Sequence, residues 1–238
     1  MKFDINYHPS WNDFFTNKQF DALDELEKIE NLIGEDYFPS PQNVLRFMKL
    51  DIKNIKYVIV GMEPYPSSFE KNGIIYPEAT GRSFEVASLE GKSWNDKFKQ
   101  SSLRNIIKTI YYNETNEKID LDTLRKKIEI GEFKISNPSI WFNKTEKQGV
   151  LWLNATLTVQ SYKVDTHKKF WAKFMEEVII YMKNENPYLK WVLWGQPAKE
   201  RVLPLVGEQN CICTMHPRLV GFIDENCFSS MKDIVWKC

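Results

Sequence analysis

Three polar side chains able to take part in acid–base and hydrogen-bond chemistry each accompany a short apolar run in the sequence. Glu63 comes after the first run, Asn154 ends the second, and His216 follows the last. Short apolar runs of this kind are typical of strands that are buried on both faces of a parallel sheet. Ligands of such sheets bind beyond the carboxyl ends of the strands, so the sequence predicts an acid, an amide and an imidazole at one edge.

This combination of groups suits the hydrolysis of a glycosidic bond to a pyrimidine. Such a bond breaks through a transition state with positive charge on the sugar and negative charge on the departing base. The carboxylate of Glu63 could stabilise the cation and position water, and His216 could donate a hydrogen bond to the base. The Asn154 amide offers a donor and an acceptor that match O4 and N3–H of uracil, whereas cytosine presents the reverse pattern.

The elements that must position these side chains alternate along the chain. The apolar runs lie at 56–60, 150–153, 191–194 and 211–215, and helical patterns occupy 11–33, 41–48, 101–111, 121–128 and 170–182. Parallel neighbours can be joined only through crossover connections. The alternation therefore predicts an α/β fold, a three-layer α/β/α sandwich with a central, mainly parallel four-stranded sheet. The loop 61–84 is longer than a simple connection between two elements needs to be, so we expect it to form part of the pocket.

The chain as a whole carries no net charge. It has 238 residues, with 32 Lys plus Arg and 32 Asp plus Glu, so a polyanion could be attracted only by a local patch. Length and the absence of repeats or linkers predict one domain spanning 1–238. No apolar segment is long enough to cross a bilayer and no export signal or heptad pattern is visible, so we expect a cytoplasmic monomer.

Three sequence motifs together resemble those of the family 1 uracil-DNA glycosylases. The chain has G-M-E-P-Y-P at 61–66, G-V-L-W-L-N-A-T-L-T-V at 149–159 and H-P-R-L at 216–219, in the order of that family. With proline as its last residue, the first motif looks similar to that of the divergent poxvirus members of the family, which also have proline there. The resemblance covers most of the chain. It implies hydrolysis of the N-glycosidic bond of a uracil flipped out of DNA, which leaves an abasic site in base excision repair.

The resemblance also implies roles for individual residues. Glu63 stands where the family has its water-activating acid, and His216 matches the histidine that faces uracil O2. Asn154 matches the residue that reads uracil. Tyr65 matches the ring that excludes the methyl group of thymine, and Phe84 matches the ring that stacks on the flipped base.

Contacts to the DNA beyond the flipped base fall on a separate set of residues. By resemblance, Leu219 is the wedge that enters the vacated space in the duplex, and Ser67, Ser102 and Thr158 are candidates to hold phosphates. A cationic set is expected near the same sheet edge, where it either meets phosphates or forms a solvated helix face. This set comprises Lys163, His167, Lys168, Lys169, Lys173, Lys199, Arg201 and Arg218.

Several positions depart from the motifs of the family and leave two alternatives open. Glu63 is one methylene longer than the aspartate of the family, and the loop after His216 lacks its Ser-Pro pair. Met62 and Pro66 replace Gln and His at the pocket entrance, where Met62 is expected to contact the substrate. One alternative is a catalytically weakened, glycosylase-like protein that binds DNA or a protein. The other is a glycosylase for a different damaged base.

The sequence predicts no cofactor and no metal. The four cysteines lie at 211, 213, 227 and 238 and are expected to be reduced. Cys211, Cys213 and His216 lack a fourth ligand and are better interpreted as alternate side chains of a strand and its loop. Iron–sulfur relatives carry a cysteine pair near the N-terminus, which this chain lacks. The resemblance implies uracil-containing DNA, single- or double-stranded, as partner and leaves open a protein inhibitor or a replication partner.

Overall fold

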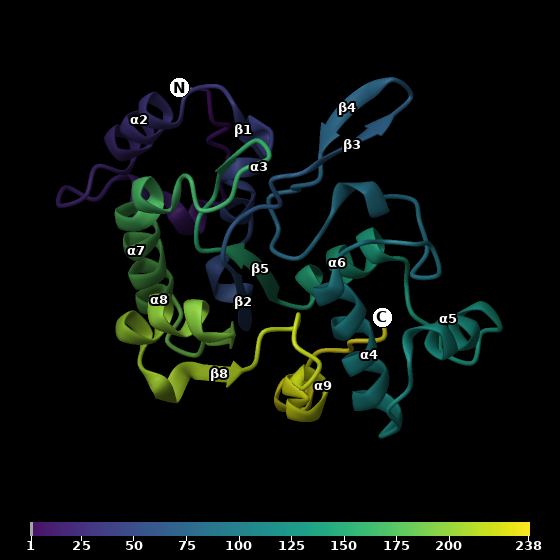
Figure 1. The fold of residues 1–238 in the computed structure, drawn as a ribbon. Coiled ribbons are helices and arrows are strands. Elements are labelled where there is room, and N and C mark those ends of the chain that lie inside the picture. The colour runs from purple at the N-terminus through teal and green to yellow at the C-terminus, as the bar shows by residue number, and fades with distance from the viewer. Residues whose placement is uncertain (1) are drawn as a thin grey trace.

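The computed structural model describes residues 2–238 and has a parallel sheet at its centre (Figure 1). The sheet contains four strands in the order β5-β2-β7-β8, and all three pairings are parallel. These strands are β2 (Tyr57–Gly61), β5 (Val150–Asn154), β7 (Lys190–Trp194) and β8 (Cys211–Thr214). The predicted fold class is confirmed, and each strand lies within one residue of its predicted bounds.

Alternate side chains of the strands point into two separate apolar cores. On β5, Leu151 and Leu153 join one cluster, whereas Val150 and Trp152 join the other. The same alternation occurs on β2 and β7. Successive side chains of a strand point to opposite faces, and both faces of this sheet are covered. For this reason the strands are apolar throughout instead of alternating with polar residues.

Helices form a layer on each face of the sheet (Figure 1). One layer contains α7 (Lys168–Glu185) and α8 (Gln196–Val206), with α2 (Ala22–Ile33) packed on α7. The other contains α4 (Ser101–Thr115), α6 (Pro138–Lys147) and α9 (Phe222–Glu225), with α5 (Leu121–Glu129) beside α4. The short elements are α1 (Asn12–Phe15), α3 (Pro41–Val44) and the paired strands β1 (Tyr37–Phe38) and β6 (Val159–Gln160). Within residues 2–238, no helix combines the length and the apolar content that crossing a bilayer requires.

The N-terminal helical segment is interrupted, although the sequence pattern over 11–33 was continuous. Helix α1 ends at Phe15, and α2 begins after Asp21, whose side chain accepts a hydrogen bond from the N–H of Asp24. Between the two helices, the Phe20 ring is 5% exposed in the core. The break allows this ring to reach the interior while Asp21 caps the second helix.

A β-hairpin projects from the body within the loop 61–84 (Figure 1). Its strands are β3 (Ser68–Lys71) and β4 (Ile74–Pro77). The turn residues Asn72 and Gly73 have φ angles of 55° and 77°, as a two-residue type I′ turn requires. The Ile74 and Ile75 side chains are 55% and 67% exposed, so the outer part of this loop adds little to the core.

Candidate active site

The ends of β2 and β5 and the loop after β8 surround a cavity of about 470 Å³. Its volume falls within the range of small-molecule sites, roughly 300 to 1,000 Å³. The structure thus brings together several of the residues singled out in the sequence. They are Met62, Glu63, Tyr65, Phe84, Ser102, Asn154, His216 and Arg218, joined by Gly61, Pro64, Pro66, Lys99, Gln100 and Ser101.

The Glu63 carboxylate is partly buried in the turn after β2. Its Oε2 accepts a hydrogen bond from the backbone N–H of Asp165 at 2.9 Å. Burial raises the pKa of Glu63, and the hydrogen bond from Asp165 and the positive charge of Lys168 offset part of this rise. The carboxylate is therefore anchored to the loop before α7 and is more basic than an exposed glutamate.

Asn154 ends β5 with 3% exposure and lines the same cavity. Gly61, its neighbour on β2, leaves room for the amide, because a Cβ there would lie 2.6 Å from both Asn154 Oδ1 and Ser83 Cβ. Ala155 extends the contact between the strands by donating its N–H to Gly61 O at 2.8 Å. Within residues 2–238 the Asn154 side chain makes no hydrogen bond, so its donor and its acceptor are both available to a ligand.

Phe84 is held rigidly in an uncommon backbone conformation. Its φ is 63°, in the left-handed region that bulky residues rarely adopt. The ring packs against Trp194 and Trp152 at centroid distances of 5.1 and 6.3 Å, and it lies 6.1 Å from the ring of His216. A fixed aromatic ring beside an imidazole in a cavity offers a stacking surface to a planar ligand.

Tyr65 and Met62 complete the wall of the cavity next to the acid. Burial, with a smaller contribution from the Glu78 carboxylate, raises the pKa of the Tyr65 phenol, which stays neutral at physiological pH. Met62 packs against the core on one face of the sheet and Tyr65 against the core on the other. These contacts restrict both side chains and so limit the width of the cavity.

His216, in the loop after β8, is held in its neutral form. Burial and, to a smaller extent, the positive charge of Arg218 lower the pKa of His216. The ring Nδ1 accepts a hydrogen bond from the backbone N–H of Arg218 at 3.0 Å. An accepting Nδ1 leaves the proton of the neutral ring on Nε2, which is then a hydrogen-bond donor. Gly195 makes room for this residue, because a Cβ there would lie 2.9 Å from His216 Cβ.

Asn105 on α4 holds the loop that carries the imidazole, a role that the sequence analysis missed. Its Nδ2 donates to the carbonyl oxygens of Pro217 and Leu219 at 2.7 and 3.3 Å. It is 8% exposed among the buried residues of α4, and a buried amide in a helix indicates a hydrogen-bond role. Asp165 was missed as well. No side-chain signal could have identified it, because it contacts Glu63 through its backbone N–H.

The residues expected to contact DNA are distributed unevenly around the cavity. Ser102 and Arg218 line it. Ser67 is exposed outside the lining residues, just before β3, and Leu219 is 50% exposed in the loop after His216. The contacts of these four side chains with phosphates and with the duplex remain predictions.

Thr158 and His167 lie in the interior, which corrects the expectation that their side chains contact phosphates. Thr158 is 0% exposed and His167 is 4% exposed. The Thr158 Oγ1 lies 3.0 Å from His167 Nδ1 and accepts a hydrogen bond from Trp171 Nε1 at 2.7 Å. These two side chains therefore satisfy each other inside the protein and link the segment after β5 to α7.

The cysteines and His216 do not form a metal site. Cys211 and Cys213 are alternate residues of β8, and the thiols of all four cysteines are free. Burial raises the pKa of Cys211 to about 11. In the part of the chain that the structure describes, no group of three His, Cys, Asp or Glu side chains is arranged to hold a metal ion.

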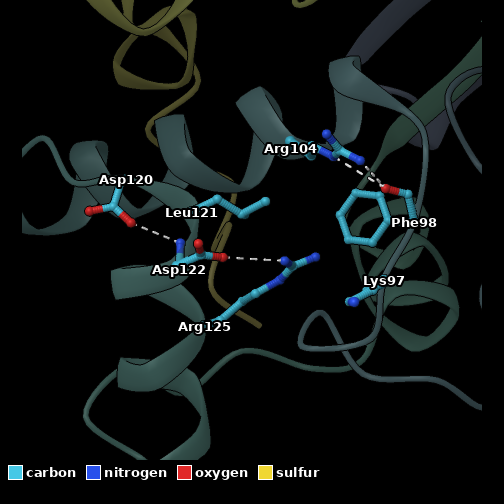
Figure 2. Close-up of a pocket in the computed structure, with 7 residues that line it drawn as sticks. All are labelled: Lys97, Phe98, Arg104, Asp120, Leu121, Asp122 and Arg125. Carbon is cyan, nitrogen blue, oxygen red and sulfur yellow. Dashed lines mark hydrogen bonds and ion pairs between the residues drawn. The ribbon is translucent and has the colours of Figure 1, made fainter.

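Another hollow, of about 410 Å³, lies where α4 and α5 meet the loop that precedes α4 (Figure 2). Arg104 donates to the carbonyl oxygen of Phe98 at 3.2 Å, and Arg125 faces Asp122 at 3.6 Å. Both arginines are thus engaged by the protein itself, and no histidine or amide side chain lines this hollow. The acid, amide and imidazole groups occur together in the 470 Å³ cavity instead.

Curated proteins from several bacteria are similar to this chain over most of its length. The uracil-DNA glycosylase of Francisella philomiragia is 28% identical over 198 residues, which cover 81% of this chain and 76% of that protein. The uracil-DNA glycosylase of Azobacteroides pseudotrichonymphae is 26% identical over 244 residues, which cover 98% of this chain and 96% of that protein. No family model matches the chain.

Solved structures share the fold. The UNG of Nitratifractor salsuginis superposes with a TM-score of 0.71 at 22% identity, covering 96% of this chain and 92% of that chain. The mimivirus uracil-DNA glycosylase superposes with a TM-score of 0.62 at 24% identity, covering 89% of this chain and 69% of that chain. A variant of the mimivirus UNG, solved in complex with UGI, gives a TM-score of 0.63 at 24% identity, covering 89% of this chain and 70% of that chain.

Proposed function

The chain belongs to the uracil-DNA glycosylase family, and from this premise we propose that it hydrolyses the N-glycosidic bond of uracil flipped out of DNA. The product is an abasic site, the first intermediate of base excision repair. The observation that carries the proposal is the cavity shared by Glu63, Asn154 and His216. An anchored acid, an amide free of protein hydrogen bonds and a neutral imidazole match the three needs of pyrimidine excision.

Recognition of the base falls to Asn154, Phe84 and Tyr65. The Asn154 Nδ2 donates to uracil O4 and its Oδ1 accepts from N3–H, whereas cytosine would oppose donor to donor and acceptor to acceptor. Phe84 stacks on the base plane. Tyr65 fills the space that a methyl group on C5 would need, so thymine is excluded. The buried, unpaired amide of Asn154 supports this assignment, because a wrong base would leave it unsatisfied.

Cleavage depends on Glu63 and His216. As the bond between C1′ of the sugar and N1 of the base breaks, its electron pair leaves with uracil, and His216 Nε2–H donates a hydrogen bond to the anionic O2. Glu63 stabilises the positive sugar, orients a water molecule toward C1′ and accepts its proton as the new bond forms. The lowered pKa of His216 and the raised pKa of Glu63 support these roles of neutral donor and base.

An oligonucleotide assay tests the proposal directly. Single- and double-stranded DNA with one uracil is incubated with the protein, and abasic product is revealed by alkaline strand cleavage. We expect product from uracil and none from cytosine or thymine at the same position. An Asn154→Ala variant should lose the preference for uracil. Absence of product from both uracil substrates would contradict the proposal.

Two other outcomes of this assay correspond to the alternative functions. DNA binding without turnover, unchanged by Glu63→Gln, would indicate a glycosylase-like binding protein. Excision of another lesion in a panel of damaged bases would indicate a different substrate. The reason to test such a panel is that Met62 and Pro66 line the cavity in place of the Gln and His of the family.

A protein inhibitor is a further partner to test. The mimivirus UNG variant was solved in complex with UGI, and we propose that the cavity edge of this chain offers a comparable surface. Titration with UGI should then abolish uracil excision at a stoichiometric ratio. Unchanged excision in excess UGI would show that the departures around the 216–219 loop have removed this interaction.

A further inference from the structure

A second cavity adjoins the candidate active site on the α7 side. It has a volume of about 530 Å³ and lies where the start of α7 meets α8. Its lining residues are Asp165, Thr166, Lys168, Lys169, Ala172 and Arg201. The two cavities are joined by one hydrogen bond, from the Asp165 N–H of this cavity to the Glu63 carboxylate of the other, at 2.9 Å.

The cations of this cavity lack acidic partners. Within residues 2–238, Lys168, Lys169 and Arg201 form no ion pair. In contrast, Lys173, one turn further along α7, pairs with Glu25 at 3.2 Å. The residues that line the cavity thus carry three positive side chains and one carboxylate, that of Asp165, which gives the cavity wall a net positive charge. The Glu176 and Glu63 carboxylates, which act on Arg201 and Lys168, lie outside the lining.

Arg201 carries an unmet hydrogen-bond demand. Its NH2 nitrogen is buried and has no hydrogen-bond partner in the structure. Burial lowers the pKa of Arg201, and the Glu176 carboxylate partly opposes this change. A buried guanidinium nitrogen left without an acceptor is costly, so a rotation of the Arg201 side chain that brings this nitrogen to an anionic oxygen in the cavity would relieve that cost.

The backbone at the start of α7 also favours an anion in this cavity. The N-cap residue His167 provides no side-chain cap, and its carbonyl oxygen accepts from the N–H groups of Phe170 and Trp171, so the N–H groups of Lys168 and Lys169 remain available at the start of this 18-residue helix. Helix N-termini favour anions through these N–H groups and the helix dipole. Thr166 Oγ1 already accepts the N–H of Gln160 at 2.9 Å, which leaves its hydroxyl hydrogen free to donate.

We propose that Lys168, Lys169 and Arg201 form a phosphate site that binds a phosphodiester of the DNA strand outside the flipped nucleotide. The site rests on the proposed function, since it takes DNA as the ligand. Its direct connection to Glu63 favours a phosphate of the strand bound at the active site over a free anion. The positive charge of Lys168 also lowers the pKa of Glu63. We therefore expect one DNA strand to contact both cavities.

The test compares single substitutions that remove one positive charge each. Lys169→Gln and Arg201→Gln alter the proposed site, and Lys173→Gln is the matched control on the same helix, outside the cavity. Lys168 is left intact because its charge acts on Glu63. The dissociation constant of a fluorescent, uracil-free duplex and of a single strand is measured by anisotropy between roughly 50 and 200 mM salt.

We expect each site variant to lower the slope of log K against log salt by about 0.9 for the duplex and about 0.7 for the single strand. The dissociation constant should rise several-fold, while Lys173→Gln behaves like the unmodified protein. Equal slopes for Lys169→Gln, Arg201→Gln and Lys173→Gln would overturn the proposal. Lys169 is exposed, so its variant keeps the test valid even if Arg201→Gln fails to fold.

Two additional measurements separate this proposal from others. If the unmodified protein excises uracil while the slopes stay equal, the phosphate site fails and the proposed function stands. If the protein binds DNA and excises no uracil, the proposed function fails instead. Inorganic phosphate is titrated without DNA: a thermal shift lost in Lys169→Gln, with unchanged DNA slopes, would assign the site to a free anion and overturn the DNA assignment.

Discussion

The Glu63 carboxylate combines partial burial with an anchoring hydrogen bond from Asp165. A glutamine at this position keeps the shape and can still accept that bond, but it cannot take a proton from water. We expect Glu63→Gln to lower the single-turnover rate of uracil excision by about 10²- to 10⁴-fold. Affinity for uracil-containing DNA should remain. An unchanged rate would exclude Glu63 as the base.

The pH dependence of excision follows from the same carboxylate. A base must be ionised, and the pKa of Glu63 is raised above 4.5, so activity should fall on acidification at a higher pH than an unperturbed glutamate would allow. Burial lowers the pKa of His216, which moves the protonation of this ring to lower pH than that of an exposed histidine. The measurement is kcat/KM against pH.

Lys168 provides a control for this pH assignment. Its positive charge lowers the pKa of Glu63, so Lys168→Gln should shift the acidic limb of the pH profile to higher pH. Lys173→Gln, whose lysine is paired with Glu25, should leave the limb in place. An acidic limb that does not move in Lys168→Gln would mean that another group controls it.

Gly61 controls the position of the Asn154 side chain, which lies far away in sequence but directly opposite it on the neighbouring strand. A methyl group there would meet Asn154 Oδ1 and Ser83 Cβ at 2.6 Å, so Gly61→Ala must displace the amide. Misplacement of a positioned group costs on the order of 100-fold in rate. We expect this loss in uracil excision. Gly73→Ala strains only the hairpin turn, where φ is 77°, and lies outside the cavity, so it should leave excision unchanged. Equal rates for both variants would contradict the role of Gly61.

At the scale of elements, α4 controls the loop that carries His216. Asn105→Ala removes two hydrogen bonds and leaves the carbonyl oxygens of Pro217 and Leu219 without their partner. We expect a loss of about 1–3 kcal/mol in the free energy of unfolding by urea and slower excision. The control is Asn113→Ala on the same helix. If both variants unfold and react alike, the loop is held by other contacts.

The strands were predictable because strands buried on both faces have continuous apolar runs, and the crossover helix was predictable because it has a wide apolar stripe. Asn154 and His216 could be placed because they stand at the ends of such runs. Thr158 and His167 could not, since a polar residue that pairs inside the protein looks the same in sequence as one that faces a phosphate. The Asn72-Gly73 signal of the hairpin was present in the sequence and was missed.

At the scale of the whole molecule, the two cores share one sheet. Each strand contributes alternate side chains to both, so neither core can lose its packing without exposing the other. We expect residues 1–238 to unfold as one cooperative domain. Far-ultraviolet and near-ultraviolet circular dichroism should then give coincident urea transitions. Two separated midpoints would show that the helical layers unfold independently.

All eight tryptophan side chains are buried below 2% exposure, and Trp194 lies 5.1 Å from the ring of Phe84. The protein therefore contains its own optical reporter. Its emission should be that of indoles shielded from water, and a planar ligand that settles on Phe84 would change the surroundings of the nearest indole. Occupancy of the cavity could thus be followed in real time by intrinsic fluorescence, with neither a label on the nucleic acid nor one on the protein.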